Sequence, residues 1–136
     1  MNYWLIKSEP FKYSWEKFKK DKKAVWDGVR NYSARNNMRA MKKGDLAFFY
    51  HSNEGLEIVG IAKITKEAYQ DPTTEDAAWC VVELSPFKTL KRPVSLSEIK
   101  ADEKLSEMQI VKMSRLSVSV VKPFEFDYII ALSELK

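Results

Sequence analysis

Apolar residues occur in short runs of strand length, separated by polar and charged stretches. The runs Tyr3–Ile6 and Leu46–Tyr50 are continuous, Leu56–Thr65 is rich in β-branched residues with a bulge or bend at Gly60, and Leu116–Val120 alternates apolar with polar positions. Each of these patterns is typical of a strand. The predicted strands are Tyr3–Ile6, Leu46–Tyr50, Leu56–Thr65, Trp79–Leu84 and Leu116–Val120.

Capping residues between these runs predict short helices. Ser14 precedes a segment in which Trp15 and Phe18 share one face, and Ser95 and Glu98 have the spacing of a capping box. Gly44 closes a second helical segment, and a proline opens the last one. The predicted helices run over Trp15–Lys20, from Ser33 or Ala34 to Lys43, from Ser95, and from Pro123.

The order of these elements predicts one α+β domain over residues 1–136. A chain of 136 residues with 45% hydrophobic residues can bury a sizeable core. It contains neither an internal repeat nor a linker-like stretch. Five to six strands interrupted by short helices indicate a small mixed barrel.

Composition removes several classes of function. The chain has no signal-peptide pattern and no apolar run of membrane-spanning length, so we expect a soluble, cytoplasmic protein, and a monomer. The one cysteine, Cys80, cannot form an internal disulfide or hold zinc by itself, and we expect it in the core. No metal-ligand cluster, glycine-rich phosphate loop or dinucleotide motif is present, so no metal or cofactor is expected.

Charge and aromatic residues gather in the N-terminal third. Lys7 to Lys43 holds 12 of the 23 basic residues and 4 of the 19 acidic ones, a net charge of +8. Tyr3 to Tyr50 holds 11 of the 17 aromatic residues. This combination suits stacking on bases beside a phosphate backbone. The alternative is a solvated lysine-rich helix face, made of Lys17, Lys19, Lys20, Lys22 and Lys23.

The segment Trp26–Tyr32 contains Asp-Gly turn chemistry and has neither a helical nor a strand period. It is therefore predicted to be an irregular loop that carries large side chains. A loop with a tryptophan and hydrogen-bonding residues is a candidate binding loop.

Five segments together carry a resemblance to a known family: Trp4–Pro10, Trp26–Asn37, Gly44–Leu46, Phe49–Asn53 and Arg115–Val118. In this order and spacing they resemble the EVE domain. The resemblance runs over nearly the whole chain and implies a PUA-like pseudobarrel related to YTH domains. It also implies a non-enzymatic module that binds DNA or RNA and holds a modified base, cytosine or adenine, in an aromatic pocket.

The resemblance assigns roles to seven residues of a base pocket. The resemblance implies that Trp26 forms a wall of the aromatic cage and that Ser8 and Asn31 contact the edge of the base. It implies that the remaining four residues lie at the mouth of the pocket: Tyr50, His51, Ser52 and Arg115. The chain departs from the family pattern between Asp71-Pro72 and Trp79, where it is shorter.

Structural alternatives exist for most of these assignments. Trp26 could be a core residue, Asn31 a helix cap, and Ser8 a partner of backbone groups at the strand end. Arg115 could be a buried structural partner.

Six basic residues are candidates for contact with the phosphate backbone. The fork-shaped guanidinium donors and the lysine ammonium groups both suit phosphate. The alternative for Arg30 or Arg35 is an internal ion pair with Asp27 or Asp45. The six candidates are Lys7, Lys19, Lys20, Arg30, Arg35 and Arg39.

Two other functions compete with a binding module. His51 beside Ser52, with Ser8 or Asp45 near it in space, would be the basis of a small nucleic-acid-processing hydrolase. No nucleophile-elbow signal accompanies these residues. A basic face can also bind acidic proteins, which would make the chain a protein-interaction adaptor.

Overall fold

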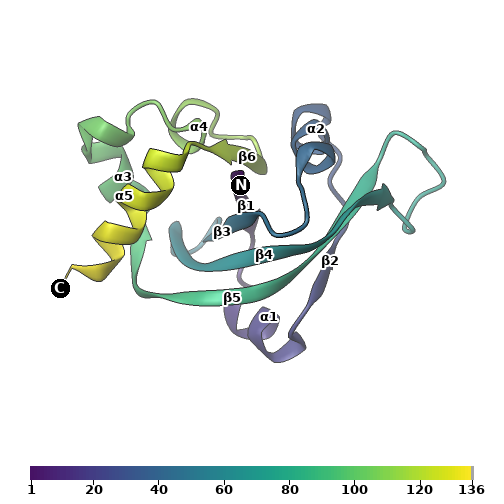
Figure 1. Ribbon diagram of the computed structural model, residues 1–136, viewed down its shortest axis with the longest axis horizontal. Coiled ribbons are helices and arrows are strands. Elements are labelled where there is room, and N and C mark those ends of the chain that lie inside the picture. The colour runs from purple at the N-terminus through teal and green to yellow at the C-terminus, as the bar shows by residue number, and fades with distance from the viewer. Residues whose placement is uncertain (136) are drawn as a thin grey trace.

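The computed structural model describes residues 1–135 and contains one mixed six-stranded sheet (Figure 1). The strand order is β2-β5-β4-β3-β1-β6, and only the neighbours β1 and β3 are parallel. The strands are β1 (Tyr3–Ser8), β2 (Ala24–Trp26), β3 (Leu46–His51), β4 (Glu57–Gln70), β5 (Cys80–Ser95) and β6 (Val118–Val121).

Short helices surround the sheet, and two of them begin at predicted caps. The Ser14 side chain accepts a hydrogen bond from the Lys17 amide at 3.0 Å, and the Ser95 side chain accepts one from Glu98 at 3.1 Å. These bonds satisfy amides that have no partner inside the helix. The helices are α1 (Trp15–Asp21), α2 (Tyr32–Ala40), α3 (Leu96–Ala101), a 3-10 turn (Glu103–Leu105), α4 (Gln109–Lys112) and α5 (Pro123–Glu134).

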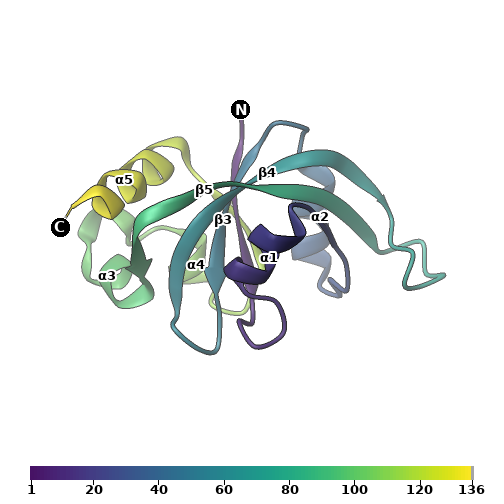
Figure 2. The same ribbon diagram turned by 90° about the horizontal axis from the view of Figure 1, so that it is seen from below.

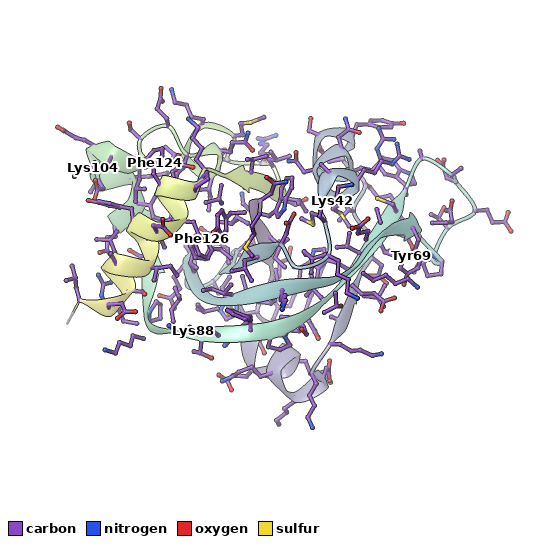
Figure 3. All side chains as sticks on the ribbon, in the orientation of Figure 1. Lys42, Tyr69, Lys88, Lys104, Phe124 and Phe126 are labelled. Atoms are coloured by element: carbon purple, nitrogen blue, oxygen red, sulfur yellow. The ribbon has the colours of Figure 1, made fainter. Side chains whose placement is uncertain are left out.

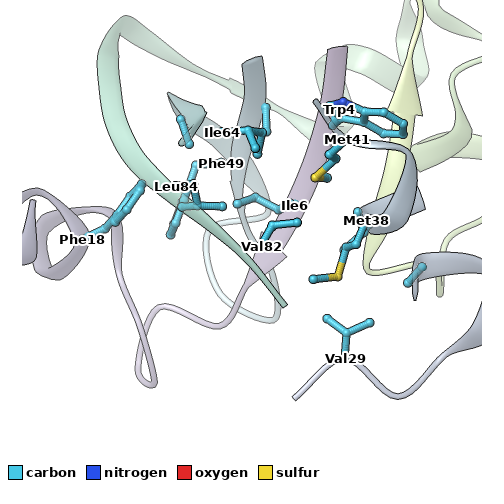
Figure 4. Packing of buried hydrophobic residues seen from close by; sticks show 14 of the residues in the cluster. Trp4, Ile6, Phe18, Val29, Met38, Met41, Phe49, Ile64, Val82 and Leu84 are labelled. Carbon is cyan, nitrogen blue, oxygen red and sulfur yellow. The ribbon is translucent and has the colours of Figure 1, made fainter. Parts of the chain in front are cut away.

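Two hydrophobic clusters lie on opposite faces of the sheet. In β1, Ile6 belongs to one cluster and Leu5 to the other; in β3, Phe49 and Phe48 are divided in the same way. Successive side chains of a strand point to opposite faces, so a strand buried on both faces reads as a continuous apolar run. Figure 4 shows the first cluster, in which Phe49 lies beside Leu84 and Ile64, and Met38 of α2 lies on the other side of Ile6.

The second cluster is closed by the C-terminal helices. The Phe126 ring of α5 stacks on Tyr3 at 4.1 Å and on Phe48 at 4.6 Å between centroids. Figure 3 shows Phe126 directed toward the sheet, whereas Phe124, two residues earlier, is exposed. In Figures 1 and 2, α3 and α5 lie together at one end of the molecule, and the loop that joins β4 to β5 lies at the other.

The bend predicted at Gly60 is present and has a packing cause. The β4 pairing shifts register between Ile58 and Gly60, and a Cβ atom added at Gly60 would lie 2.3 Å from the Trp15 ring. Only glycine leaves room for the indole of α1 to lie this close to the strand.

Several sequence-based boundaries differ in the structure. Trp26 ends strand β2 and does not open an irregular loop. The helix α2 begins at Tyr32 and ends at Ala40, with Met41 and not Gly44 as its C-cap. The strands β4 and β5 are longer than predicted and form one hairpin. Pro86 of β5 is accommodated where the register shifts beside Ala62, because a bulge tolerates the missing donor.

The helices over residues 1–135 are short. None of them is long and apolar enough to cross a membrane. Cys80, at the start of β5, is buried in the first cluster, as the sequence predicted.

Candidate functional site

An open cavity of about 640 Å³ lies where β1 ends beside β2. Its wall is formed by Lys7 and Ser8 of β1, parts of the turn from Glu9 to Tyr13, Asp21 at the end of α1, the segment from Lys23 to Arg30, and Ser117. The structure therefore brings together four predicted site residues, Lys7, Ser8, Trp26 and Arg30, which come from separate segments of the sequence.

Trp26 forms an aromatic wall of this cavity. Its ring meets Phe49 edge-on at 5.8 Å and Tyr13 at 6.2 Å between centroids, with interplanar angles of 78° and 65°. The side chain is half-buried, packed at its edge against the first cluster, and it lines the cavity. Trp26 is therefore neither a fully buried core residue nor a freely mobile surface residue.

Ser8 and Tyr13 supply polar groups to the same cavity. The Ser8 hydroxyl donates to the Tyr13 carbonyl at 2.5 Å, which leaves the Ser8 oxygen able to accept from a ligand. The Tyr13 hydroxyl donates to the Asp21 carboxylate at 3.0 Å. Burial and this acidic partner raise the pKa of Tyr13 to about 12, so the phenol stays protonated at neutral pH.

The loop after Trp26 is held by a buried carboxylate that the sequence reasoning did not single out. Asp71 accepts hydrogen bonds from the Gly28 amide at 3.2 Å, from Arg30 at 2.9 Å, and from the amide and hydroxyl of Thr73. Burial acts to raise the pKa of Asp71, but the bonds from Thr73, Arg30 and Gly28 outweigh burial and hold the pKa below its usual range. Asp71 therefore fixes the cavity wall as an ionised group.

Both charge signs are present around the cavity, but most of the acidic groups have internal partners. Glu9 pairs with Lys12 at 3.3 Å, and Asp21 takes the Tyr13 hydroxyl. The Lys7 ammonium donates to the Ser114 carbonyl at 2.7 Å, and partial burial lowers its pKa. The exposed Lys23 lies on the cavity rim.

A second, shallower hollow of about 890 Å³ shares the Lys23 side chain with the cavity. This hollow continues along the surface toward Tyr69 of β4, labelled in Figure 3. Its charged lining consists of Lys22, Lys23, Lys43, Lys66, Glu67 and Glu83.

Two predicted pocket residues lie away from the cavity. Asn31 is the N-cap of α2, and its side-chain oxygen accepts from the Ala34 amide at 2.9 Å, which is the structural alternative that the sequence left open. Tyr50 is buried in the second cluster beside Phe48, on the opposite face of the sheet from Phe49. The period-two alternation of β3 is the reason for this placement.

The other predicted mouth residues lie nearby but do not line the cavity. The Ser52 amide donates to the Ser8 carbonyl at 2.9 Å. Arg115 is exposed on the segment that leads to Ser117 of the cavity wall, so it is not the buried structural partner of the alternative interpretation.

His51 does not have the geometry of a hydrolase triad with Asp45. Its Nε2 accepts from the Trp15 amide at 3.0 Å, and burial lowers its pKa. A ring that accepts at Nε2 is neutral and carries its proton at Nδ1. Asp45 lies beyond the other end of β3, ~20 Å away along the strand, and accepts from Trp4 and Lys42.

The predicted phosphate contacts are in three different environments. Lys19 pairs with Glu16 at 3.0 Å and Lys20 is exposed, both on α1 outside the cavity wall. Arg30 pairs with Asp71, and not with Asp27 or Asp45. The other two candidate arginines, Arg35 and Arg39, belong to α2 and donate to the Ala78 carbonyl at 3.1 and 3.4 Å.

The cavity also contains residues for which the sequence reasoning gave no role. Tyr13, Lys12 and Lys23 belong to the basic, aromatic third of the chain, which was the available signal. Asp27 follows Trp26 directly and had been considered only as an ion-pair partner. Asp71 carried no signal, because its partners Gly28 and Arg30 lie more than 40 positions earlier.

A mixed six-stranded sheet with short surrounding helices defines an α+β domain of the PUA-like type, as predicted. The sequence matches the EVE domain over residues 2–132, and the chain belongs to the EVE domain family.

Relatives of this chain are found both by sequence and by structure. Mouse thymocyte nuclear protein 1 is 40% identical over 98% of this chain and 74% of its own length. A crystal structure of an Agrobacterium tumefaciens protein superimposes with a TM-score of 0.96 at 47% identity, over 99% of this chain and 94% of that one. Human THYN1, solved in complex with 5-methylcytosine-containing DNA, gives a TM-score of 0.93 at 35% identity, over 100% and 99% of the two chains.

A YTH domain from Zygosaccharomyces rouxii, solved with N6-methyladenosine RNA, has a TM-score of 0.59 at 12% identity over 98% of this chain and 86% of its own. At this level of identity the likeness concerns the fold alone. The YTH domain therefore shares the fold of this chain.

Proposed function

We propose that this chain is a non-enzymatic module that binds nucleic acid and recognises a modified cytosine or adenine in the cavity beside Trp26. The observation that carries the proposal is the half-buried Trp26 ring on the wall of a 640 Å³ cavity. Small-molecule sites have volumes of about 300 to 1,000 Å³ and combine apolar walls with a few polar groups.

The relatives support the same ligand class. Human THYN1 was solved with DNA that contains 5-methylcytosine, and it matches this chain over its full length. The basic N-terminal third supplies the electrostatic attraction that such a ligand needs.

Each wall of the cavity has a role in the proposal. The indole of Trp26 stacks on the base or encloses its added methyl group. The Ser8 oxygen accepts from the base edge, and the Asp27 carboxylate can accept from an exocyclic amine. Lys12 and Lys23 at the cavity, with Lys7, attract phosphate.

Selectivity for a methyl mark is expected to be moderate. Burial of one methyl group contributes about 0.8 kcal/mol. A shaped hydrophobic pocket raises the discrimination to roughly 1 to 3 kcal/mol, which corresponds to about 5- to 150-fold. We therefore expect measurable binding of unmodified oligonucleotides as well.

The first experiment measures binding of the wild-type chain to a panel of DNA and RNA oligonucleotides. The panel contains single- and double-stranded forms with 5-methylcytosine, N6-methyladenine or no modification, and binding is followed by fluorescence anisotropy. Tighter binding to one modified form than to its unmodified counterpart supports the proposal. Equal binding of every modified and unmodified pair would refute it.

Trp26→Ala assigns the recognition to the cavity. The variant should lose the preference for the modified base but keep much of the affinity for unmodified oligonucleotide, because the basic residues remain. Trp26→Phe keeps an aromatic face and should retain most of the preference. A folded Trp26→Ala protein that still discriminates would place the recognition site elsewhere.

A further inference from the structure

Four side chains beside the cavity form a continuous stack of cationic and aromatic groups. The guanidinium of Arg30 lies over the Trp79 ring at 5.6 Å, the Trp79 and Tyr32 rings are 4.9 Å apart, and Arg35 lies over Tyr32 at 4.9 Å. We call Arg30, Trp79, Tyr32 and Arg35 the arginine–aromatic ladder.

The ladder begins at the cavity and leads away from it. Arg30 lines the cavity, whereas Trp79, Tyr32 and Arg35 do not. Trp79 lies at the base of the loop between β4 and β5 that projects from the molecule in Figure 1, and Tyr32 is the first residue of α2. The ladder therefore joins two surface segments on one side of the cavity.

The ladder is exposed at Tyr32, next to its Arg35 end. Tyr32 is 61% exposed although its ring contacts two ladder neighbours. The flat π-face of an aromatic side chain is a surface on which an unpaired base can stack.

Arg35 is held in place by three hydrogen bonds. Its Nη1 donates to the Ala78 carbonyl at 3.1 Å, and its Nε and Nη2 donate to Asn36 at 3.1 and 2.7 Å. These bonds use three of the five guanidinium N–H donors and restrict the movement of the group beside Tyr32. A flat guanidinium held in this way is a stacking surface for a base.

The charges around the ladder favour the same interpretation. Glu75 and Asp76 are exposed on the loop that carries Trp79. Two carboxylates on that loop repel a phosphate backbone, but they do not oppose the stacking of an uncharged base.

We propose that the outer end of the ladder, Tyr32 capped by Arg35, stacks on an unpaired base that flanks the base held in the cavity. This proposal rests on the proposed function, because it takes nucleic acid as the ligand and a base in the cavity as the neighbour of the stacked base. The stacking is indifferent to the modification, because every base has a π-face.

The test uses the full chain and a fluorescein-labelled single-stranded DNA 9-mer with a central 5-methylcytosine, together with its unmodified counterpart. Tyr32→Ala should weaken both oligonucleotides alike, by about five-fold or more. Replacing the flanking bases one at a time by abasic sites should weaken wild-type binding at one position. At that position Tyr32→Ala should show no further loss, because the stacked pair is already broken.

Arg35→Lys separates stacking from charge. Lysine keeps the positive charge but has no planar face, so the variant should lose affinity without a change in the salt dependence of binding. Phe87→Ala is the matched control. Phe87 is 55% exposed, and its ring centroid lies 5.9 Å from the Lys63 ammonium. It is about 26 Å from Trp79 of the ladder along β5. This control should bind as the wild type does.

Three results would overturn the ladder proposal. The first is unchanged affinity in a folded Tyr32→Ala protein. The second is that each abasic site lowers the affinity of the wild type and of Tyr32→Ala equally, at every position. The third is wild-type affinity in Arg35→Lys. The proposed function fails on a different measurement, namely equal wild-type binding of every modified and unmodified pair in the oligonucleotide panel. If the wild type binds no oligonucleotide of the panel, both proposals fall.

Discussion

The two faces of one sheet are built from different side chains. The face under α3 and α5 is filled mainly by aliphatic residues, and its few rings, such as Phe48 and Phe126, stack inside it. The face under α1 carries Trp15, Phe18 and Phe49, which contact one another at 5.3 to 5.6 Å between centroids.

The aromatic face differs from the aliphatic face in how it ends. Its ring cluster continues through Phe49 to Trp26, which lines the open cavity. Because Phe18 and Phe49 are fully buried, the ring that touches Trp26 cannot move freely. The comparison indicates that the closed face supplies stability, whereas the edge of the aromatic face holds the wall of an open cavity in a fixed orientation.

The largest expected effect is on the closed face. Phe48 has no exposed surface, and its ring stacks on Phe126 at 4.6 Å. Phe48→Ala should lower the free energy of unfolding by about 3 to 5 kcal/mol, because it removes buried area and leaves a cavity. Urea denaturation measures the loss, and the folded fraction should keep its preference for the modified base.

Trp26→Ala is the matching change on the aromatic face. Trp26 is half-buried, so its truncation should cost only about 1 to 2 kcal/mol of unfolding free energy. A loss as large as that of Phe48→Ala would make Trp26 a core residue and would remove the contrast between the two faces.

Asp71→Asn should have an intermediate effect, because Asp71 joins the cavity loop to the segment after β4. The variant leaves Arg30 without its anionic partner while keeping a side chain of similar size. We expect a loss of about 2 kcal/mol, less than for a fully buried pair, since 39% of the Arg30 side chain is exposed. Thermal denaturation measures it, and oligonucleotide affinity should fall as the loop loosens.

The same carboxylate predicts a dependence on pH. The folded pKa of Asp71 lies below its usual range, whereas the unfolded pKa is about 3.9. Its stabilisation is therefore complete above about pH 4 and is lost as the pH falls through the folded pKa. Wild type should lose unfolding free energy below about pH 4, and Asp71→Asn should lose less over the same range. Identical acid profiles would contradict the assignment.

Local signals predicted much of this architecture. Ser14 and Ser95 marked helix starts, because a capping bond involves residues three positions apart. The continuous apolar runs identified β1 and β3, which lie in the middle of the sheet. Trp26 and Ser8 were placed at the site by resemblance, and the cavity brings them together.

Long-range contacts could not be predicted in the same way. The partner of Arg30 is Asp71, 41 positions away, whereas the sequence offered Asp27 and Asp45 as nearer carboxylates. Tyr50 could not be assigned to a face from a run in which every residue is apolar, since both faces of β3 are buried. The strands β4 and β5 were predicted too short, because bulges and prolines interrupt their strand pattern.

The smallest expected effect on stability comes from charge reversal on α1, which lies outside the cavity wall. Lys19→Glu with Lys20→Glu replaces two cations in the last helical turn, and Lys19 loses its bond to Glu16. The cost should stay below about 1 kcal/mol of unfolding free energy, because these groups are largely exposed. Nucleic-acid binding is more sensitive, since the N-terminal third carries the basic charge.

We expect this variant to bind modified and unmodified oligonucleotides more weakly by the same factor, so that the ratio of the two affinities does not change. Wild-type affinity should fall as salt rises, and the slope of log affinity against log salt should shrink by about one for each phosphate that the variant no longer neutralises. Lys100→Glu with Lys104→Glu makes the same charge change at the end of the molecule where α3 and α5 lie. If this control weakens binding as much as the α1 variant does, the attraction follows net charge and α1 has no special part in it. A change in the modified-to-unmodified ratio would instead couple α1 to the cavity and would blur the division between backbone attraction and base recognition.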